Sequence, residues 1–172
     1  RKRQMCIRDR MMQYSDIIFG DQNEWEIASG VPHIPFEALD ENYVIDREAY
    51  LSYFRKMHRL FPKCKKMVMA VRNQIASSHH TLSGLLYDTV EDQLYTTRIY
   101  DIQPIVDPMG VGDAFIAAYI HAHQKWGDEN QYCLDFSLSA SAIKNTIPGD
   151  QNLVSEEEII SNMTSSGGRI QR

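Results

Sequence analysis

The sequence predicts an α/β protein whose ligand binds at the carboxyl ends of its strands, and three observations support this class. Short apolar runs and amphipathic stretches follow one another in the order strand, helix, strand, strands, helix, helix, helix. One strand-to-helix junction carries two glycines, Gly110 and Gly112, followed directly by Asp113. The composition, 43% hydrophobic and 24% charged, is ordinary for a globular protein. Open α/β sheets bind ligands at such junctions.

The individual elements follow from periodicity and from helix start and stop signals. Asp46 is expected to cap a helix whose apolar residues recur from Ala49 to Phe61, and Pro62 ends it. Ser155 and Glu158 have the spacing of a capping box that opens the last helix. The other expected elements are strands at 16–20, 66–71, 81–87, 93–100 and 102–106, polar turns at 21–26 and 73–80, a loop at 31–44, and helices at 114–126 and 132–144.

The junction at 107–115 has the chemistry of an anion site. Gly110 and Gly112 allow a sharp turn and close approach of a ligand to the backbone. The first amides of the following helix lack intrahelical partners and lie at the positive end of its dipole. The carboxylate of Asp113 would lie beside them, an arrangement suited to phosphoryl transfer. A left-handed turn that only closes a strand–helix unit is the structural alternative.

Two other nucleotide motifs do not match this junction. Phe115 occupies the place of the third glycine in a dinucleotide-binding fingerprint, and no Lys-Ser or Lys-Thr pair follows as in a P-loop. Protein-kinase signatures are also missing from the sequence. The junction therefore predicts a phosphate site of another kind.

Charge and cysteine usage bound the partners and the compartment. The net charge of −5 does not suggest a nucleic-acid partner, and the apolar run at 114–120 is too short to span a membrane. Cys6, Cys64 and Cys133 are far apart and form no C-x-x-C pair, which favours free thiols in the cytoplasm. The first ten residues hold five basic groups and one acid and show no helix or strand period, so we expect residues 1–12 to be a non-native or disordered leader.

The junction resembles the D-T-x-G-A-G-D-x-F signature of the ribokinase-like (PfkB) carbohydrate kinases, with Pro108 in the usual Thr place and Val111 in the usual Ala place. The runs Leu94–Asp107, Lys144–Val154 and Gly167–Arg172 extend the similarity. Within the family they are most similar to the kinases that act on 2-dehydro-3-deoxygluconate. The resemblance covers residues 13–172 and implies the C-terminal part of a three-layer αβα fold.

The resemblance implies a role for each part of the junction. The amides of Gly110, Val111 and Gly112 would form the anion hole, and Asp113 would be the base that activates the sugar hydroxyl. ATP and Mg²⁺ are the implied cofactors, with a monovalent cation near the loop of Asp107. Pro108 stands in place of the signature's threonine in that loop, so this chain departs from the family next to the expected cation site.

A family N-x-x-E motif that helps to organise magnesium and phosphate falls in the acidic stretch after the first strand. Counting back from Gly30 assigns its two positions to Asp21 and Glu24, whereas matching the letters assigns them to Asn23 and Glu26. We prefer the first register because it requires no deletion. Acids that only complement a helix dipole are the structural alternative.

The remaining candidates concern the nucleotide. Arg72 would contact a phosphate or the acceptor, with Arg98 as a weaker candidate. Asn145 and the turn at Pro148-Gly149 would border the adenine pocket, where the small residues at 137–142 allow a flat ring to approach. A close-packed helix followed by a type II turn explains the same residues without a ligand. His79 and His80 are adjacent, but the sequence offers no further ligands for a metal.

The sequence predicts a division of the chain after the leader and a set of candidate functions. Residues 13–164 would form the nucleotide-binding portion and residues 165–172 a flexible tail. The favoured function is ATP-dependent phosphorylation of 2-dehydro-3-deoxygluconate, with a sugar acid and ATP as small-molecule partners. Another sugar kinase of the same family and a truncated, non-catalytic nucleotide-binding module are the alternatives. A homo-oligomer of the full-length protein stays open.

Overall fold

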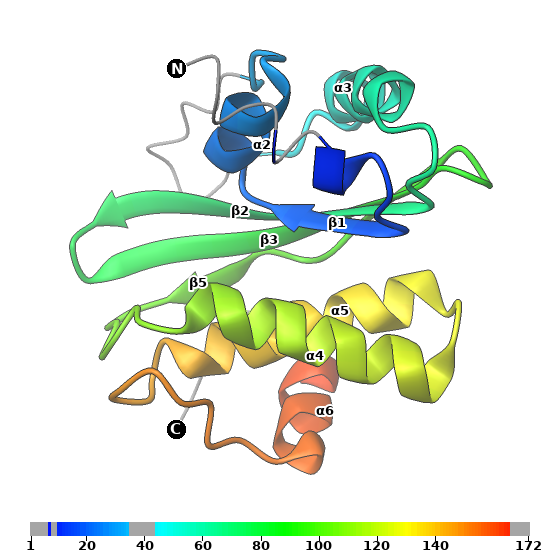
Figure 1. The fold of residues 1–172 in the computed structure, drawn as a ribbon. Helices are drawn as coiled ribbons and strands as arrows, with labels where there is room; N and C mark the ends of the chain where they lie inside the picture. The colour runs from blue at the N-terminus through cyan, green and yellow to red at the C-terminus, as the bar shows by residue number, and fades with distance from the viewer. Residues whose placement is uncertain (1–6, 8–9, 35–43, 166–172) are drawn as a thin grey trace. The chain divides into compact units, whose positions relative to one another are not determined.

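The computed structural model describes residues 7, 10–34 and 44–165 (Figure 1). The chain divides into two compact units. The first unit comprises Arg1–Glu37, Tyr43–Met69 and Leu85–Tyr95, and the second comprises Ala38–Asn42, Ala70–Gly84 and Thr96–Arg172. Strands β2 (Lys66–Ala76) and β3 (His79–Asp88) are each divided, with one end in the first unit and the other end in the second.

The strands form a mixed sheet with the order β1-β2-β3-β4, and β5 also pairs with β3. β1 (Ile17–Gly20) runs parallel to β2, with Ile17 opposite Lys66. β5 (Tyr100–Ile102) runs antiparallel to β3, with Thr81 opposite Asp101, and β4 (Gln93–Thr96) completes the order. Together with the helices described below, this sheet confirms the predicted α/β class.

The first unit carries α2 (Gln22–Ser29) and α3 (Arg47–Leu60) beside β1 (Figure 1). The turn expected at 21–26 is wrong, because Asp21 and Glu24 form a reciprocal capping box that starts a helix there. Asp46 caps α3 as predicted, with its carboxylate accepting from the Ala49 amide at 3.0 Å. In the core the ring of Phe54 packs edge-on against Trp25 and stacks on Tyr87, each at a centroid distance of 5.7 Å.

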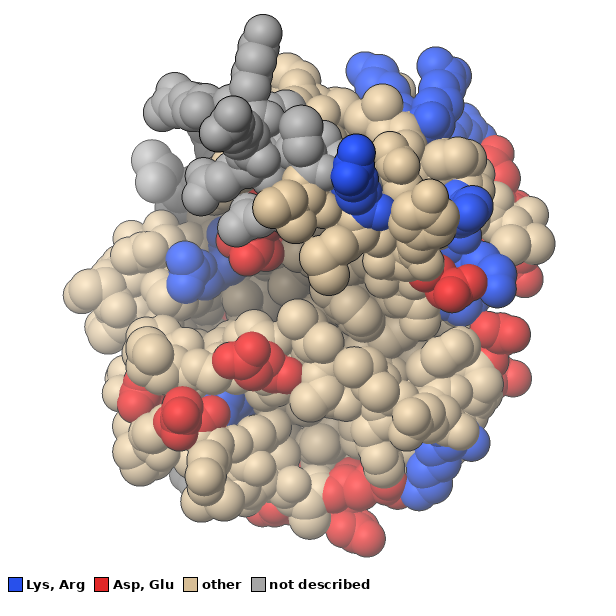
Figure 2. Space-filling model, in the orientation of Figure 1, with Lys and Arg blue, Asp and Glu red and all other residues tan. Residues whose placement is uncertain are grey.

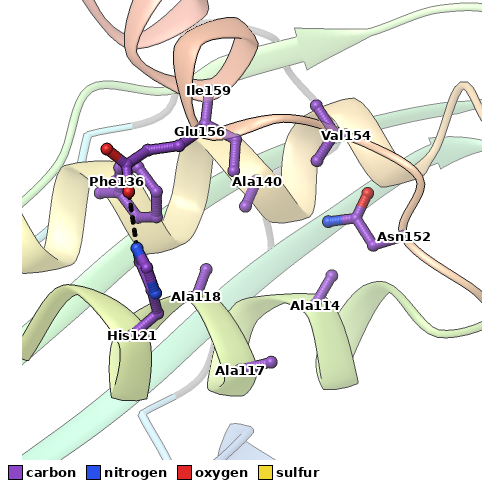
Figure 3. Close-up of a pocket in the computed structure, with 10 residues that line it drawn as sticks. All are labelled: Ala114, Ala117, Ala118, His121, Phe136, Ala140, Asn152, Val154, Glu156 and Ile159. Atoms are coloured by element: carbon purple, nitrogen blue, oxygen red, sulfur yellow. Dashed lines mark hydrogen bonds and ion pairs between the residues drawn. The ribbon is translucent and has the colours of Figure 1, made fainter. Parts of the chain in front are cut away.

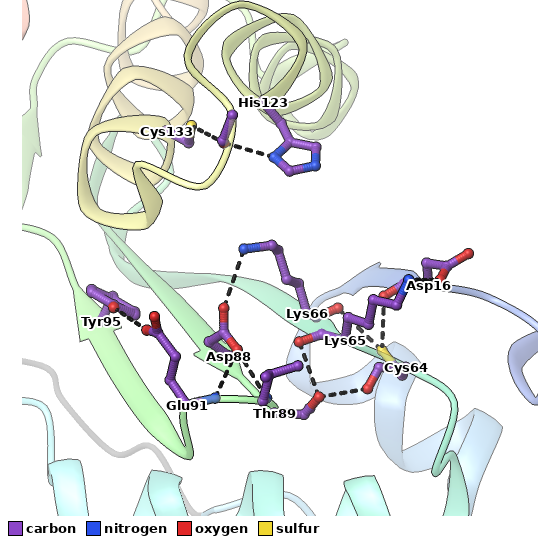
Figure 4. Close-up of polar contacts among 12 residues, drawn as sticks. Asp16, Cys64, Lys65, Lys66, Asp88, Thr89, Glu91, Tyr95, His123 and Cys133 are labelled. Atoms are coloured by element: carbon purple, nitrogen blue, oxygen red, sulfur yellow. Dashed lines mark hydrogen bonds and ion pairs between the residues drawn. The ribbon is translucent and has the colours of Figure 1, made fainter.

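A polar network within the first unit fixes the ends of β2 and β3 (Figure 4). Lys66 Nζ lies 3.2 Å from Asp88 Oδ2, and both side chains are only 8% exposed. Asp88 Oδ1 also accepts from the amides of Val90 and Glu91, which closes the turn after β3. Burial raises the pKa of the neighbouring Cys64 thiol to about 11, so this cysteine is a structural thiol.

In the second unit, β2 and β3 form a longer hairpin than the sequence suggested. The turn expected at 73–80 is wrong: β2 continues to Ala76, and only Ser77 and Ser78 form the turn. Asn73 is buried within β2, so its polarity did not mark a surface turn. All ten residues of β3 are buried, which explains why its polar positions do not alternate with apolar ones.

Two expected strands are shorter, because their backbone groups bond elsewhere. The strand expected at 93–100 is interrupted after Thr96, where Thr97 exchanges hydrogen bonds with Gly84 through its backbone amide and its hydroxyl. The strand expected at 102–106 ends at Ile102. Beyond it, the amides of Val106 and Asp107 both donate to the Asn145 carbonyl. These two bonds connect the chain after β5 to the C-terminal end of α5 instead of to a neighbouring strand.

Three helices complete the second unit: α4 (Val111–Trp126), α5 (Asn130–Lys144) and α6 (Glu156–Thr164) (Figure 1). Three buried serines of α5 connect it to the other two. Ser137 and Ser141 donate to carbonyls of α4, at Phe115 and Val111, and Ser139 donates to the carbonyl of Ile159 in α6. The small-residue stretch of α5 therefore packs directly against neighbouring backbones. Gly127 ends α4 and Ser155 caps α6, both as predicted.

The ends of the chain and its surface add three observations. Of the expected leader at 1–12, residues 7 and 10–12 are described and are helical, and its other residues lie outside the described part, as do residues 166–172 of the tail. No helix among the described residues is long and apolar enough to cross a membrane. On the face drawn in Figure 2, acidic and basic side chains are interspersed among uncharged ones.

Candidate active site

The N-terminus of α4 offers a set of unpaired backbone amides. Gly110 is its N-cap, with φ +74° and ψ 4°, and the first amide with a partner is that of Ala114, which donates to the Gly110 carbonyl at 2.8 Å. The four preceding amides, 110–113, have no acceptor among the residues that the structure describes. Free amides at the positive end of a helix dipole form an anion-binding site.

The two glycines of this turn are required for different reasons. A Cβ on Gly110 would lie 2.1 Å from the carbonyl oxygen of Asp150, and its positive φ also disfavours any side chain. Gly110 is therefore demanded by the fold. A Cβ on Gly112 would meet no atom within 4 Å. The absence of a side chain at Gly112 leaves open space beside the free amides, which is what a ligand approaching the backbone needs.

Asp113 lies in the first turn of α4 and is exposed. Its carboxylate has no hydrogen-bond or ion-pair partner among the described residues. The side chain is thus neither sealed in an apolar interior nor used in a cap. A carboxylate in this place can accept a proton from a group held at the amides.

Asp107 holds the loop before the turn in shape. Its Oδ1 accepts from the Met109 amide at 2.9 Å and its Oδ2 from the Gly149 amide at 2.8 Å. These two amides, with a smaller contribution from Lys144, hold the pKa of Asp107 below its usual range. The carboxylate therefore joins the loop at 107–110 to the loop at 145–150, and its lone pairs are already partly used.

The predicted nucleotide contacts Asn145, Pro148 and Gly149 lie in this second loop. Asn145 is buried, and its side-chain amide donates to the Ser141 carbonyl at 3.0 Å while its own carbonyl anchors the chain at 106–107. Pro148 and Gly149 are exposed, and Gly149 has the positive φ of +80°. Buried Lys144 donates from Nζ to the Ile147 carbonyl at 3.0 Å. In the structure these residues shape the turn next to the amides.

A pocket of about 280 Å³ runs along α4 from the same turn (Figure 3). Its lining comes from α4, α5, α6 and the loop before α6, and it is dominated by alanine methyl groups and other apolar side chains. None of its residues was predicted as a site residue. The lining residues are Ala114, Ala117, Ala118, His121, Phe136, Ala140, Asn152, Val154, Glu156 and Ile159.

A polar network closes the end of the pocket that is remote from the turn. Glu156 of α6 contacts His121 Nε2 at 2.8 Å and Lys125 Nζ, both on α4 (Figure 3). Lys125, and then His121, hold the pKa of Glu156 below its usual range, so it stays a carboxylate. The His121 ring stacks on Phe136 with centroids 5.8 Å apart. His121 is exposed on α4, which agrees with the helix-surface position expected from the sequence, but its contact with Glu156 beside a pocket was not predicted.

A signal for the pocket was nevertheless present. Ala117 and Ala118 were interpreted as close-packing residues, and the small run at 137–142 as a place where a flat ring could approach. The second interpretation applies to Ala140, which lines the pocket from α5. Small residues on two facing helices leave space between them that only a structure can locate.

The predicted magnesium residues lie in the first unit. Asp21 Oδ1 accepts from the Glu24 amide at 2.8 Å, and Glu24 Oε2 accepts from the Asp21 amide at 2.9 Å. Both residues therefore cap the start of α2, and the acidic start agrees with the structural alternative of acids that complement the helix dipole. In the other register, Glu26 is paired with His33. The described residues contain no group of three or more His, Cys, Asp or Glu that could hold a metal by themselves.

Arg72 and Arg98 differ in how far the fold uses them. Arg72 is exposed on β2 and has no hydrogen-bond partner among the described residues. Burial, and then the charge of Arg72, lower the pKa of His80. Arg98 instead donates to the carbonyls of Asn162 and Ser165, so it anchors the end of α6. Arg72 remains the better candidate for binding an anion.

Comparison with solved structures defines the class: the structural neighbours are PfkB-family carbohydrate kinases, and the chain has their ribokinase-like α/β fold. One of them is 2-dehydro-3-deoxygluconokinase from Thermotoga maritima, 27% identical, with a TM-score of 0.80 over 95% of this chain and 46% of that one. A PfkB-family carbohydrate kinase from Listeria grayi is 22% identical, with a TM-score of 0.77 over the same shares. Ribokinase from Thermotoga maritima is 20% identical, with a TM-score of 0.57 over 91% of this chain and 45% of that one.

The chain therefore spans about half the length of the solved kinases that it matches. No protein-family model matches the sequence, and comparison with curated proteins finds no significant match.

Proposed function

We propose that this chain supplies the nucleotide-binding and phosphoryl-transfer part of an ATP-dependent sugar kinase in the cytoplasm. The observation that carries the proposal is that the unpaired amides at the N-terminus of α4 are followed directly, along the same helix, by an alanine-lined pocket. The amides suit a phosphate chain, and the apolar pocket suits a nucleoside. The volume of the pocket, about 280 Å³, is just below the range of about 300–1,000 Å³ that is usual for small-molecule sites.

In this proposal the amides at 110–113 bind the terminal phosphates and stabilise the charge that develops on the transferred group. Asp113 accepts the proton of the attacking sugar hydroxyl. The oxygen of that hydroxyl forms a bond to the γ-phosphorus while the bond to the β–γ bridging oxygen breaks, so that ADP leaves. Asp113 and Gly112 are neighbours in the first turn, so the base and the anion site move as one element.

Magnesium would neutralise the phosphate charge when bound, and we assign Asp21 and Glu24 as its protein contacts. Each carboxylate oxygen accepts more than one interaction, so a capping carboxylate retains lone pairs for a metal-bound water. Mg²⁺ commonly takes only one or two carboxylates, together with substrate phosphates and waters, and so needs no protein-only cluster. A monovalent cation near Asp107 would share that loop with the buried ammonium of Lys144.

For the acceptor we propose 2-dehydro-3-deoxygluconate. Support comes from the sequence runs at 94–107 and 144–154 and from the similarity to the Thermotoga kinase named for that sugar acid. The alternatives are another sugar kinase of the same family and a module that binds nucleotide without turnover. Phosphorylation of a panel of sugar acids and sugars separates these possibilities.

The test of the catalytic role is Asp113→Asn in a polypeptide that also carries the remaining half of a homologous kinase. Loss of a general base lowers turnover by about 10²–10⁴-fold, whereas ATP affinity should change little, because the amides and the pocket are untouched. Steady-state kinetics and ATP titration measure the two effects separately. Turnover close to that of the unsubstituted enzyme would remove Asp113 from this role.

A further inference from the structure

One pocket residue has no explanation in the packing of the fold. Asn152 lies in the loop before α6 and lines the pocket among apolar neighbours. Its Oδ1 is buried without a hydrogen-bond partner, and no partner for its Nδ2 exists among the described residues. Buried amides are normally satisfied, so an unpaired one that lines a cavity indicates a ligand group that completes its hydrogen bonds.

The position of Asn152 along α4 indicates which part of a nucleotide it meets. In Figure 3, Asn152 faces the pocket at the Ala114 end, while His121 and Glu156 lie at the other end. Ala114 directly follows the four unpaired amides of the α4 N-terminus. In a nucleoside triphosphate the ribose comes between the phosphates and the base. With phosphates at the amides, the ribose is therefore the part that lies beside Asn152.

The chemistry of the two groups also matches. A primary amide presents one acceptor atom and one donor atom, and half a turn of its terminal bond exchanges them. A ribose hydroxyl both donates and accepts, so it pairs with the amide in either orientation. The alanine methyl groups around Asn152 cannot form such a bond, and the Glu156 network lies at the opposite end of the pocket.

We propose that Asn152 binds a ribose hydroxyl of the nucleotide and makes the site select ribonucleotides over deoxyribonucleotides. This inference rests on the proposed nucleotide function and adds a specificity-determining residue to it. It concerns binding alone, so it can be tested on the 172-residue chain without any acceptor sugar.

The test compares the affinities of ATP, 2′-deoxy-ATP and 3′-deoxy-ATP by calorimetric titration. The unmodified chain should bind at least one deoxy analogue about 3- to 10-fold more weakly than ATP, the range expected for one hydrogen bond. Asn152→Leu, in which the side chain keeps a similar volume, should bind all three nucleotides with equal affinity. If the leucine variant does not fold, Asn152→Ala takes its place and should show the same equal affinities. Gln151→Leu, next to Asn152 but outside the pocket lining, is the matched control and should keep the discrimination.

Two results would overturn the ribose assignment while leaving the proposed function intact: ATP and both deoxy analogues bind the unmodified chain equally, or Asn152→Leu keeps the discrimination. If the unmodified chain binds no ATP, the proposed function fails together with this inference. The comparison of analogues on the unmodified chain needs no substitution, so its outcome does not depend on whether a variant folds.

Discussion

Replacing Gly112 by alanine should stabilise the protein and at the same time weaken nucleotide binding. A Cβ on Gly112 meets no atom within 4 Å, and the residue lies in the first turn of α4, where alanine is favoured over glycine. The gain in stability should be about 0.5–1 kcal/mol, which raises the unfolding midpoint by about 1–4 °C for a domain of this size. The same substitution at Gly110 should destabilise, because its φ is +74° and its Cβ would overlap the Asp150 carbonyl.

The loss of binding follows from the same open space. The methyl group of alanine would stand beside the unpaired amides, where a phosphate must approach the backbone. Displacing one charge-assisted hydrogen bond, worth about 1.5–3 kcal/mol, weakens ATP affinity by about 10- to 100-fold. Thermal unfolding and calorimetric titration of Gly112→Ala measure the two effects on one sample. A variant that is more stable and binds ATP as tightly as the unmodified chain would refute the assignment of the phosphates to this turn.

Two further predictions concern the loop clamp and the pocket. Asp107→Asn should lower the unfolding midpoint at pH 7. The folded pKa of Asp107 is depressed, so its contribution to stability is present above the unfolded pKa of about 3.9 and is lost as the pH falls through the folded pKa. In unfolding experiments below about pH 4, the difference in midpoint between the two proteins should therefore shrink. A difference that is constant with pH would contradict the clamp. Ala117→Leu should fill part of the pocket and weaken ATP binding by at least about 10-fold, without loss of stability because Ala117 is exposed. Gln124→Leu, on the same helix but outside the pocket lining, is the control and should leave the ATP affinity unchanged. Equal ATP affinities of the two variants in titrations would exclude the pocket as the nucleoside site.

The junction at 107–115 shows how much of this site could be predicted from sequence. Two glycines after an apolar run predicted a turn at a helix N-terminus, and the structure places Gly110 at the N-cap and Asp113 in the first helical turn. Local sequence determines such features because the backbone conformation of glycine and the start of a helix are short-range properties. That the two glycines serve different purposes depends on the Asp150 carbonyl, forty residues away, and could not be predicted.

The two turns that were wrongly expected had a common cause, which was that polarity was taken as a sign of an exposed turn. Asn73 and His79 suggested a turn, yet both are buried in strands, and His79 pairs with Asp101 at 2.5 Å. Asp21 and Glu24 suggested a polar turn, yet they start a helix by capping each other. Asn152 drew no attention at all, because an isolated asparagine in a loop has no pattern. Its position became informative only when the pocket around it was known.

The central claim is that the amides at the N-terminus of α4 bind phosphate, and an amide NMR titration tests it directly. Spectra of the ¹⁵N-labelled chain would be recorded with ATP and, separately, with adenosine. With ATP, the largest shifts are predicted at Val111, Gly112 and Asp113, and with adenosine those three signals should stay in place while pocket residues such as Ala118 still move. ATP-induced shifts that leave residues 110–113 unmoved would contradict the claim.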